Sequence, residues 1–519
     1  MVGSARRTGA IDRSAGARPR DMSKGLPSGW ADVRKFGAMG NGSVIDSPSI
    51  NKAIDYVAER GGGTVYFPPG IYASYSIRLK SHVTLHLEVG ASILAASTPP
   101  EGMASGGYDA AEPQGPWEPY QDFGHNHWHN SLIWGENLED IAIAGLGMIH
   151  GKGLNRGIAG NDFPSATVPG AGNKSIALKN CRHVLLRDFK ILQGGWFGLL
   201  ATGVDNLTVD NLIVDTNRDG FDFDCCRNVR VTNCTVNSPW DDGICLKSSY
   251  ALGYARATEN VTIDNCFVTG GYELGSVIDG TWRKMSAGFK PATGRIKCGT
   301  KSNGGFKNIA VTNCVFEACN GFAIESMDGA LCEDITISNI AMRDLVTGPF
   351  FIRLGRRMRG PAGVPIGTIK RLMIGNITSS NAAKLPSIIA GVTGHPVEDV
   401  QIHDVYLQQV GGGSAELAKR LPPLNEDGYP DPPMFGELPA TGFFIRQVRN
   451  VEMSNVEVAV ESADARPAFW MQDVSGADFF RVRPPPGPCF ALDRVTHFRT
   501  FGSRDVSDKK IDVSGTQTF

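Results

Sequence analysis

No apolar run in the 519-residue sequence approaches the roughly 18 to 20 residues that a membrane-spanning helix requires, so we expect no membrane insertion. The chain also carries almost no excess charge, because 51 Lys and Arg face 53 Asp and Glu, a net charge of −2. This balance excludes a bulk attraction to nucleic acid, and we expect no nucleic-acid partner. A local basic cleft is still compatible with it.

Cysteine pairs are missing as well. The eleven cysteines are an odd number without a CxxC pair, so the sequence implies no disulfide framework. Most of them are expected to be small buried hydrophobic residues.

The N-terminal segment lacks the apolar stretch that a signal peptide would need after Arg6 and Arg7. It is rich in Arg, Ser, Gly and Pro instead. We therefore predict that residues 1–30 form a disordered lead-in.

What the sequence does contain is a repeat. Short segments of the form N-h-x-h-x-N-h-x-h, in which h is apolar, recur along the chain. They begin at Asn206, Asn228, Asn260, Asn308, Asp334, Asp399 and Asn450. Alternation with period two and β-branched residues indicates strands. The basic spacing of 22 to 26 residues, lengthened by insertions, is typical of a solenoid.

A parallel β-helix accounts for this repeat. Each coil would bury its inward Val, Ile and Leu against the neighbouring coils, and the repeated Asn would stack as a ladder of side-chain amides. A β-propeller is the alternative, but its blades are nearer 40 to 50 residues long. We predict an all-β fold, with a single β-helix domain over residues 31–519.

Four segments depart from the repeat. The sequence SPSINKAIDYVAERGGG predicts a helix with a Ser47 or Ser49 cap and a stop at Gly61, which would cover the open end of the solenoid. Loop insertions are expected near residues 99–130, 277–293 and 411–440, and the first is long enough to be a functional loop over one face.

Acidic residues cluster in NRDGFDFD from Asn217 and in WDDGICLKS from Trp240. Asp219 and Asp241 are 22 residues apart, which is one coil, so Asp219, Asp241 and Asp242 should stack on one face about 4.8 Å apart. Glycosidases need one carboxyl that carries a proton and one that is ionised, and crowding separates the pKa values accordingly. The alternative is that each Asp only caps a turn.

These residues resemble a known family. The opening segment, residues 32–93, and the boxes NRDGFD and WDDGICLKS are similar to glycoside hydrolase family 28, the polygalacturonase and rhamnogalacturonan galacturonidase group. The similarity extends beyond Asn455. It implies a right-handed, single-stranded parallel β-helix that hydrolyses glycosidic bonds with inversion and uses no cofactor and no metal.

The resemblance also implies catalytic roles. Asp241 would be the general acid, and Asp219 and Asp242 would hold and deprotonate the attacking water. An inverting site usually separates acid and base by about 6.5–9.5 Å.

The sequence departs from the family at two boxes. Its Gly-His-Gly box should lie near residues 268–271, where no His occurs. By residue identity, its Arg-Ile-Lys box matches Arg295 to Lys297. By position in the repeat, however, the coil that carries this box in the family corresponds to the one with Ala323 and Glu325. We favour the alignment by position in the repeat. The family's cations bind a substrate carboxylate, so without them the sequence does not determine which sugar is bound.

Other residues are candidates for binding substrate. Three cations follow the acidic site in sequence, and more lie between residues 353 and 359; each alone could be a solvated surface charge. As a set they would suit a uronate. The candidate substrate-binding residues are Lys247, Arg295, Lys297, Lys301, Glu325, His127, Trp128 and Arg353.

The sequence YQDFGHNHWHNSLIW holds His125, His127 and His129 at two-residue spacing. Alternate strand residues share a face, so a metal site is one interpretation, although zinc sites usually take ligands from elsewhere too. We favour a structural or sugar-contacting loop, in which Trp128 offers a flat face to a sugar ring.

The sequence therefore predicts an inverting, exo-acting hydrolase of pectic or related uronic-acid-containing glycans. Long insertions at one end of a groove favour release of a terminal sugar. Hydrolysis of a neutral linkage such as a rhamnoside is the first alternative, which Glu325 supports. A polysaccharide lyase and a glycan-binding fibre are less favoured. An oligo- or polysaccharide partner suggests a secreted or periplasmic enzyme; the oligomeric state is not predicted.

Overall fold

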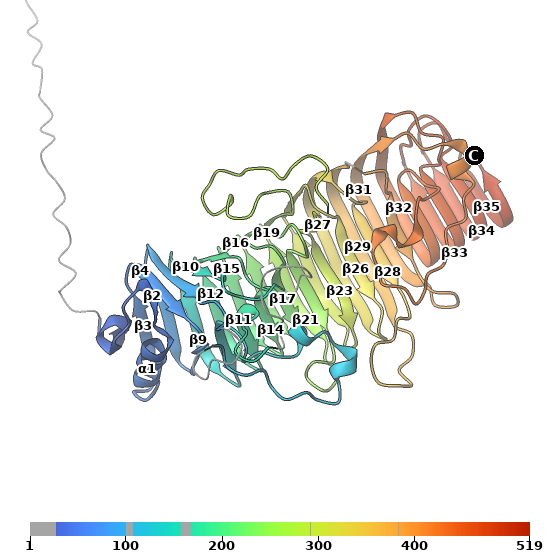
Figure 1. Cartoon of the computed structure of the whole chain (residues 1–519). Helices are drawn as coiled ribbons and strands as arrows, with labels where there is room; N and C mark the ends of the chain where they lie inside the picture. Colours follow the sequence, from blue (N-terminus) through green and yellow to red (C-terminus); the bar gives the residue numbers. More distant parts are fainter. Residues whose placement is uncertain (1–26, 100–106, 157–167, 291, 382) are drawn as a thin grey trace, which may run out of the picture.

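The computed structural model describes residues 27–99, 107–156, 168–290, 292–381 and 383–519. The predicted lead-in lies outside the described residues except for residues 27–30. Figure 1 shows an elongated stack of coils with α1 at one end and β35 at the other. The fold is a right-handed parallel β-helix, as predicted. No helix in the described part of the chain has the length and apolar character to cross a membrane.

Three columns of parallel strands run along the stack. The first column contains β5 (Ile77–Arg78), β8 (Ile133–Glu136), β11 (Lys174–Lys179), β14 (Phe197–Thr202), β17 (Asp219–Asp224), β20 (Ile244–Ser248), β23 (Ile296–Ser302), β26 (Phe322–Ser326), β28 (Phe350–Leu354) and β30 (Ser387–Ala390).

The second column contains β1 (Trp30–Asp32), β3 (Gly63–Phe67), β6 (Val83–Leu87), β9 (Glu139–Ala144), β12 (Arg182–Arg187), β15 (Asp205–Asp210), β18 (Arg227–Thr232), β21 (Thr258–Asp264) and β24 (Phe306–Thr312). The third contains β2 (Asn41–Ile45), β4 (Gly70–Ser74), β7 (Ala91–Ala95), β10 (Met148–His150), β13 (Lys190–Leu192), β16 (Ile213–Asp215), β19 (Thr235–Asn237), β22 (Phe267–Thr269) and β25 (Val315–Glu317).

Towards the C-terminus the strands become long enough to bend from one column into the next. They are β27 (Leu331–Leu345), β29 (Thr368–Asn381), β31 (Val397–Gly411), β32 (Phe443–Ser462), β33 (Phe469–Phe480) and β34 (Phe490–Phe501). The last strand, β35 (Lys509–Thr518), pairs antiparallel with β34 and covers the end of the stack. Edge strands that are covered in this way are protected from pairing with other chains.

The interior follows the alternation of the repeat. In β6, Val83, Leu85 and Leu87 are fully buried while the residues between them are half-buried. All eleven cysteines are buried and none is in a disulfide, which confirms the prediction made for them.

The predicted ladder of Asn side chains is present. Asn228 donates to Asn206 at 3.0 Å, Asn260 to Asn228 at 3.1 Å, and Asn308 to Asn260 at 2.8 Å. Each of these residues has a positive φ of 54° to 58°. Asn is one of the few side chains that tolerates this left-handed backbone, so the ladder position also shapes the turn of each coil.

The predicted helix is α1 (Ser47–Ala58), which buries Ile50, Ile54 and Val57 against the first coils. Its cap was predicted wrongly. Asp46 is the N-cap residue, and its carboxylate accepts hydrogen bonds from the backbone of Met39 and Gly40 instead of capping the helix. The other helical pieces are short: η1 (Val33–Phe36), η2 (Glu118–Tyr120), η3 (Phe123–His125), α2 (Ala415–Ala418) and η4 (Pro432–Phe435).

Candidate active site

The three predicted catalytic carboxylates lie together. Asp219 begins β17, and Asp241 and Asp242 lie just before β20 in the next coil. Backbone hydrogen bonds of 3.0 Å from Gly220 and Phe221 join the two coils at this point. One oxygen from each of the three carboxylates lies within 4.8 Å of the others. The spacing of one coil thus stacks the acidic residues as expected.

The neighbours of these carboxylates set different charge states. Burial, together with Asp241 and Asp222, raises the pKa of Asp219 well above its usual range. Burial would also raise the pKa of Asp242, but Lys297 and other cations outweigh it and hold this pKa well below its usual range. The site therefore contains one buried carboxyl that favours its proton and one that is ionised.

Asp222 is a buried site residue that the sequence reasoning did not include. Its Oδ2 accepts a hydrogen bond of 2.6 Å from Lys247 Nζ. Burial raises its pKa to about 6 although Lys247 opposes the shift. The alternation could have indicated it: Phe221 and Phe223 point into the core, so Asp222 between them must point outward.

Asp242 is held by two cations. Arg295 Nε lies 2.8 Å from its Oδ1, and Lys297 Nζ lies 3.1 Å from its Oδ2. Both cations also approach Glu325, at 3.5 and 3.4 Å. All of these side chains are at least nine-tenths buried.

The strand pairing confirms the register favoured from the repeat. Lys297 pairs with Cys245 on one side and with Ala323 on the other, so β23 is the coil between β20 and β26. Glu325 therefore occupies the coil expected for the family's cations. It is fully buried and accepts a hydrogen bond of 2.7 Å from Thr300 Oγ1.

A second group of cations lies beside the carboxylates. Lys301 Nζ is 3.1 Å from Asp122 Oδ2, and Arg359 contacts the same carboxylate at 3.3 Å. Burial lowers the pKa of Lys301 to about 8, against the opposing effect of Asp122. Arg357 pairs with Asp328. Asp122 comes from the first predicted insertion, which thus crosses from an early coil to β23.

These side chains enclose a cleft with two connected recesses. The smaller, of about 90 Å³, contains Asp219, Lys301, Arg357 and Arg359 in its wall. The larger, of about 490 Å³, contains Asn320 and Leu385 in its wall. Both recesses are bordered by Asp241, Asp242, Lys297 and Tyr429.

Three predicted substrate-binding residues lie elsewhere among the described residues. Arg353 is buried and donates to the backbone oxygens of Gly391, Leu424 and Asn425. Its hydrogen bonds therefore hold the backbone of the 411–440 insertion. It is not among the residues that border either recess. Its inward position could not be read from the cluster of arginines that follows it in sequence.

His127 and Trp128 are also buried and border neither recess. His127 Nε2 lies 3.4 Å from Glu118 Oε1. Trp128 is 2% exposed, its ring lies under Lys179, and its Nε1 donates to Thr202 Oγ1 at 3.0 Å. A sugar ring therefore has no access to the face of this indole.

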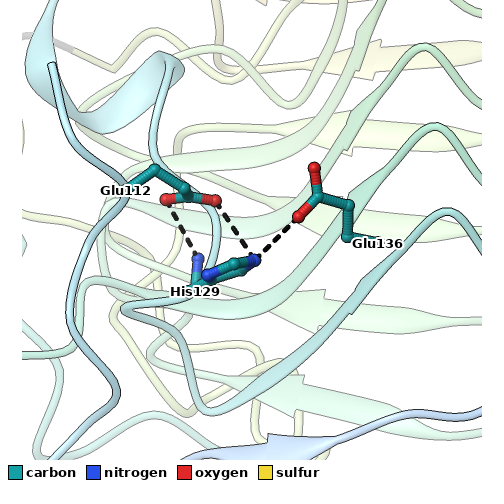
Figure 2. Close-up of side chains that lie close together, drawn as sticks. All are labelled: Glu112, His129 and Glu136. Atoms are coloured by element: carbon teal, nitrogen blue, oxygen red, sulfur yellow. Dashed lines mark hydrogen bonds and ion pairs between the residues drawn. The ribbon is translucent and has the colours of Figure 1, made fainter.

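The three imidazoles of this loop turn towards different carboxylates. His125 faces Asp222, and His129 lies between Glu112 and Glu136, as Figure 2 shows. His129 Nε2 is 2.9 Å from Glu136 and 3.5 Å from Glu112, and its ring packs on Trp134 at 3.9 Å. We call Glu112, His129 and Glu136 the loop clamp, because it ties the segment that carries Asp122 and His125 to β8.

In the part of the chain that the structure describes, three groups of side chains are close enough to share a cation. They are the loop clamp, the set His125, Asp219 and Asp222, and the set Asp219, Asp241 and Asp242. In each group a Lys or Arg already neutralises one carboxylate, namely Lys179 with Glu136, Lys247 with Asp222, and Arg295 with Asp242.

The chain is similar to several known proteins. It is 24% identical over 394 residues to a probable polygalacturonase from Vitis vinifera, covering 69% of this chain and 76% of the relative. It is 22% identical over 409 residues to an exo-poly-alpha-D-galacturonosidase from Dickeya chrysanthemi, covering 68% of this chain and 63% of the relative.

Solved structures share the fold. The exopolygalacturonase of Thermotoga maritima aligns with a TM-score of 0.60 at 17% identity over 84% of this chain and 93% of its own. The family 28 exopolygalacturonase of Yersinia enterocolitica aligns with a TM-score of 0.59 at 19% identity over 94% and 79%.

Two family profiles match the sequence itself. Residues 30–99 match the family described as rhamnogalacturonase A/epimerase, pectate lyase-like. Residues 120–422 match the glycosyl hydrolases of family 28, which is more than half of the chain. The protein with these stacked carboxylates therefore belongs to glycosyl hydrolase family 28 and is a hydrolase of O-glycosyl bonds.

Proposed function

We propose that this hydrolase removes galacturonate from the chain ends of pectic glycans. Two relatives described as a polygalacturonase and an exo-poly-alpha-D-galacturonosidase support a pectin-like substrate. The observation that carries the proposal is the stack of three carboxylates beside a buried group of cations. We further propose that the enzyme is secreted or periplasmic, where a polymeric glycan would be available.

Three Asp would divide the chemistry as the family resemblance implies. Asp241 is the most exposed of them and would protonate the leaving oxygen; its Oδ2 accepts a hydrogen bond of 3.0 Å from Arg218. Asp219 and Asp242 would hold the attacking water. Because the three oxygens lie within 4.8 Å of one another, a water between them can lie within about 2.8 Å of each, which is a hydrogen-bond distance.

Inversion of the anomeric centre rests on the family resemblance and not on the spacing of the carboxylates. Carboxyl groups are usually about 6.5–9.5 Å apart in inverting enzymes and about 5–5.5 Å apart in retaining ones. The oxygens here lie within 4.8 Å. Proton NMR of the first product formed distinguishes the two, because an inverted α-galacturonide gives the β anomer.

A count of charges indicates where a uronate would bind. Arg295 and Lys297 are matched by Asp242 and Glu325, so this group has no surplus charge. Because their charges are already neutralised, Arg295 and Lys297 would not bind a substrate carboxylate. This charge balance is the observation that favours a neutral sugar at this coil.

The surplus positive charge lies in the smaller recess. Among the described residues, Lys301, Arg357 and Arg359 form ion pairs with two carboxylates, Asp122 and Asp328, which leaves one positive charge for one substrate carboxylate. We therefore assign the uronate carboxylate to this recess.

Two insertions that both border the smaller recess support exo action. Asp122, in the segment drawn in cyan in Figure 1, contacts Arg359, 237 residues further along the chain. Tyr429, from the third insertion, lies 3.4 Å from Thr300. A groove closed at one end accepts a chain terminus better than the middle of a polymer.

Product analysis by mass spectrometry tests the proposal. Oligogalacturonides, rhamnogalacturonan fragments and rhamnosides are incubated with the wild type and with Asp241→Asn. We expect the wild type to release saturated galacturonate from a chain end and the variant to release at least about 100-fold less.

Each other product pattern would support a different function. Release of rhamnose without galacturonate would support the neutral-sugar alternative and the role of Glu325 in it. An unsaturated product that absorbs in the ultraviolet would indicate a lyase. Binding of fragments without cleavage by the wild type would favour a glycan-binding fibre and contradict the proposal.

A further inference from the structure

His125 is a buried side chain at the edge of the smaller recess that the catalytic scheme does not use. It is 5% exposed and packs edge-on against Phe197, with ring centres 4.7 Å apart. Its Nε2 lies 3.7 Å from Asp222 Oδ2, and its Nδ1 lies 3.9 Å from Asp122 Oδ2. Both separations are too long for a direct hydrogen bond.

Polar atoms without partners meet at this point. Among the described residues, neither ring nitrogen of His125 has a hydrogen-bond partner, and the same holds for Oδ1 of Asp222. Leaving buried donors and acceptors unpaired is costly, and such groups in a native site require an explanation. His125 borders the recess that would hold the sugar, and Asp222 lies next to it, 3.7 Å from its Nε2.

Burial and the nearby cations, Lys301 first among them, hold the pKa of His125 well below its usual range. The imidazole is therefore neutral and offers one donor and one acceptor. A neutral ring suits a hydroxyl group better than a carboxylate, whose counter-charge lies on Lys301 and the neighbouring arginines.

The geometry fits one hydroxyl oxygen. One ring nitrogen of His125 and one oxygen each of Asp219 and Asp222 lie within 4.8 Å of one another, so one oxygen atom between them can lie within about 2.8 Å of all three, which is hydrogen-bond distance. The recess of about 90 Å³ exceeds the roughly 30 Å³ that one water occupies, which leaves space for the edge of a sugar ring.

We infer that His125 is a specificity-determining residue: its imidazole and the carboxyl of Asp222 bind one hydroxyl group of the sugar next to the scissile bond. This inference rests on the proposed function. It divides recognition of that hydroxyl between an insertion loop, which carries His125, and β17 of the β-helix, which carries Asp222. The loop clamp holds the loop in place for this contact.

Three variants separate the two ring nitrogens. His125→Phe keeps a ring against Phe197 and removes both nitrogens. His125→Gln places a polar nitrogen near the position of Nε2, which faces Asp222, and His125→Asn places one near Nδ1, which faces Asp122. His183→Phe is the matched control, because His183 is an exposed histidine on β12 away from the cleft.

Steady-state kinetics on trigalacturonate and the inhibition constant of free galacturonate are measured for each variant, with the melting temperature as a check of folding. We expect His125→Phe to lower kcat/KM by roughly 10- to 100-fold and to weaken galacturonate inhibition, with a melting temperature close to that of the wild type. His125→Gln should recover part of this loss and His125→Asn should not.

Two results would overturn the inference. If wild-type enzyme cleaves trigalacturonate but His125→Phe retains its kcat/KM and inhibition constant, His125 binds no part of the sugar while the proposed function stands. If His125→Asn recovers activity and His125→Gln does not, the result contradicts binding of the hydroxyl at Nε2 beside Asp222. If the wild type cleaves no galacturonide, the proposed function fails and the inference fails with it.

Discussion

At the scale of single residues, the cleft is a set of acids and bases whose charge states are set by their partners. Asp242 is ionised because Lys297 and Arg295 contact it, whereas burial and the nearby carboxylates of Asp241 and Asp222 favour the proton on Asp219. Asp219 favours its proton and Asp241 is the more exposed carboxyl, so kinetics must separate the acid from the carboxyl that holds the water.

The roles of Asp241 and Asp219 can be separated with a substrate that needs no acid. Galacturonosyl fluoride has a leaving group that departs without protonation, so Asp241→Asn should retain most of its activity on the fluoride while losing at least about 100-fold on trigalacturonate. Asp219→Asn should lose activity on both. Fluoride release measures the reaction, and the reversed pattern would make Asp219 the acid.

The lowered pKa of Lys301 predicts how substrate binding depends on pH. Its pKa is lowered to about 8, so the ammonium loses its proton as pH rises through that value and the recess loses its surplus positive charge. The kcat/KM for trigalacturonate should therefore fall above pH 8. Lys301→Arg stays charged and should shift this fall to higher pH. An unchanged alkaline limb in the variant would argue against a role for Lys301 in binding the carboxylate.

At the scale of elements, a regular coil and an irregular loop make different contributions. The coils position Asp219 and Asp242 through backbone pairing. The segment from residue 107 to 131 brings Asp122 and His125 over the cleft and is tied down by the loop clamp (Figure 2). Because few regular hydrogen bonds hold this segment, its attachment should affect substrate binding more than global stability.

We expect His129→Ala to loosen the loop without unfolding the coils. The change removes the contacts of the imidazole with Glu112, Glu136 and Trp134. Hydrogen exchange within residues 107–131 should become faster and KM should rise several-fold, while the melting temperature falls by only a few degrees. His183→Ala, which removes an exposed His–Asp pair, serves as the control. Unchanged exchange in the loop would contradict a clamping role.

The Asn ladder predicts a stability effect at the regular coils. Asn228 lies in the middle of the ladder at φ 57° and bonds to Asn206 and Asn260. Asn228→Ala should cost about 2–3 kcal/mol, because it loses two hydrogen bonds and places a β-carbon in a left-handed backbone. Asn228→Gly keeps the turn and should cost less. Urea unfolding measures both, and equal costs would show that the backbone conformation contributes nothing.

At the scale of the whole molecule, the solenoid has two ends that must be covered. Helix α1 covers the first coils and β35 covers the edge of β34 (Figure 1). Phe519 packs against Phe490 and Phe498 of β34 and extends this cover.

Deletion of residues 507–519 should expose the edge of β34 and cause aggregation. An uncovered edge strand offers unpaired backbone groups to another chain. Light scattering during warming should show aggregates at a lower temperature than for the full chain. A truncated chain that stays monomeric with an unchanged melting temperature would contradict a protective role of β35.

The sequence by itself determined the coils and the stack of catalytic carboxylates. Both depend on local periodicity: alternation of apolar residues defines each strand, and a spacing of 22 residues brings Asp219 beside Asp241 in the next coil. The register that places Glu325 in the coil after Lys297 follows from the same rule, as the strand pairing confirms.

Only the tertiary structure decided which side chains of the insertions reach the cleft. His125 and Asp122 enter it, whereas His127, Trp128 and Arg353 turn into the protein. An irregular segment has no period from which a facing side can be read, and its contacts span up to 237 residues of sequence. The pairing of Arg295 and Lys297 with Glu325 is likewise a contact between coils, so the charge left for a substrate could be counted only in the folded protein.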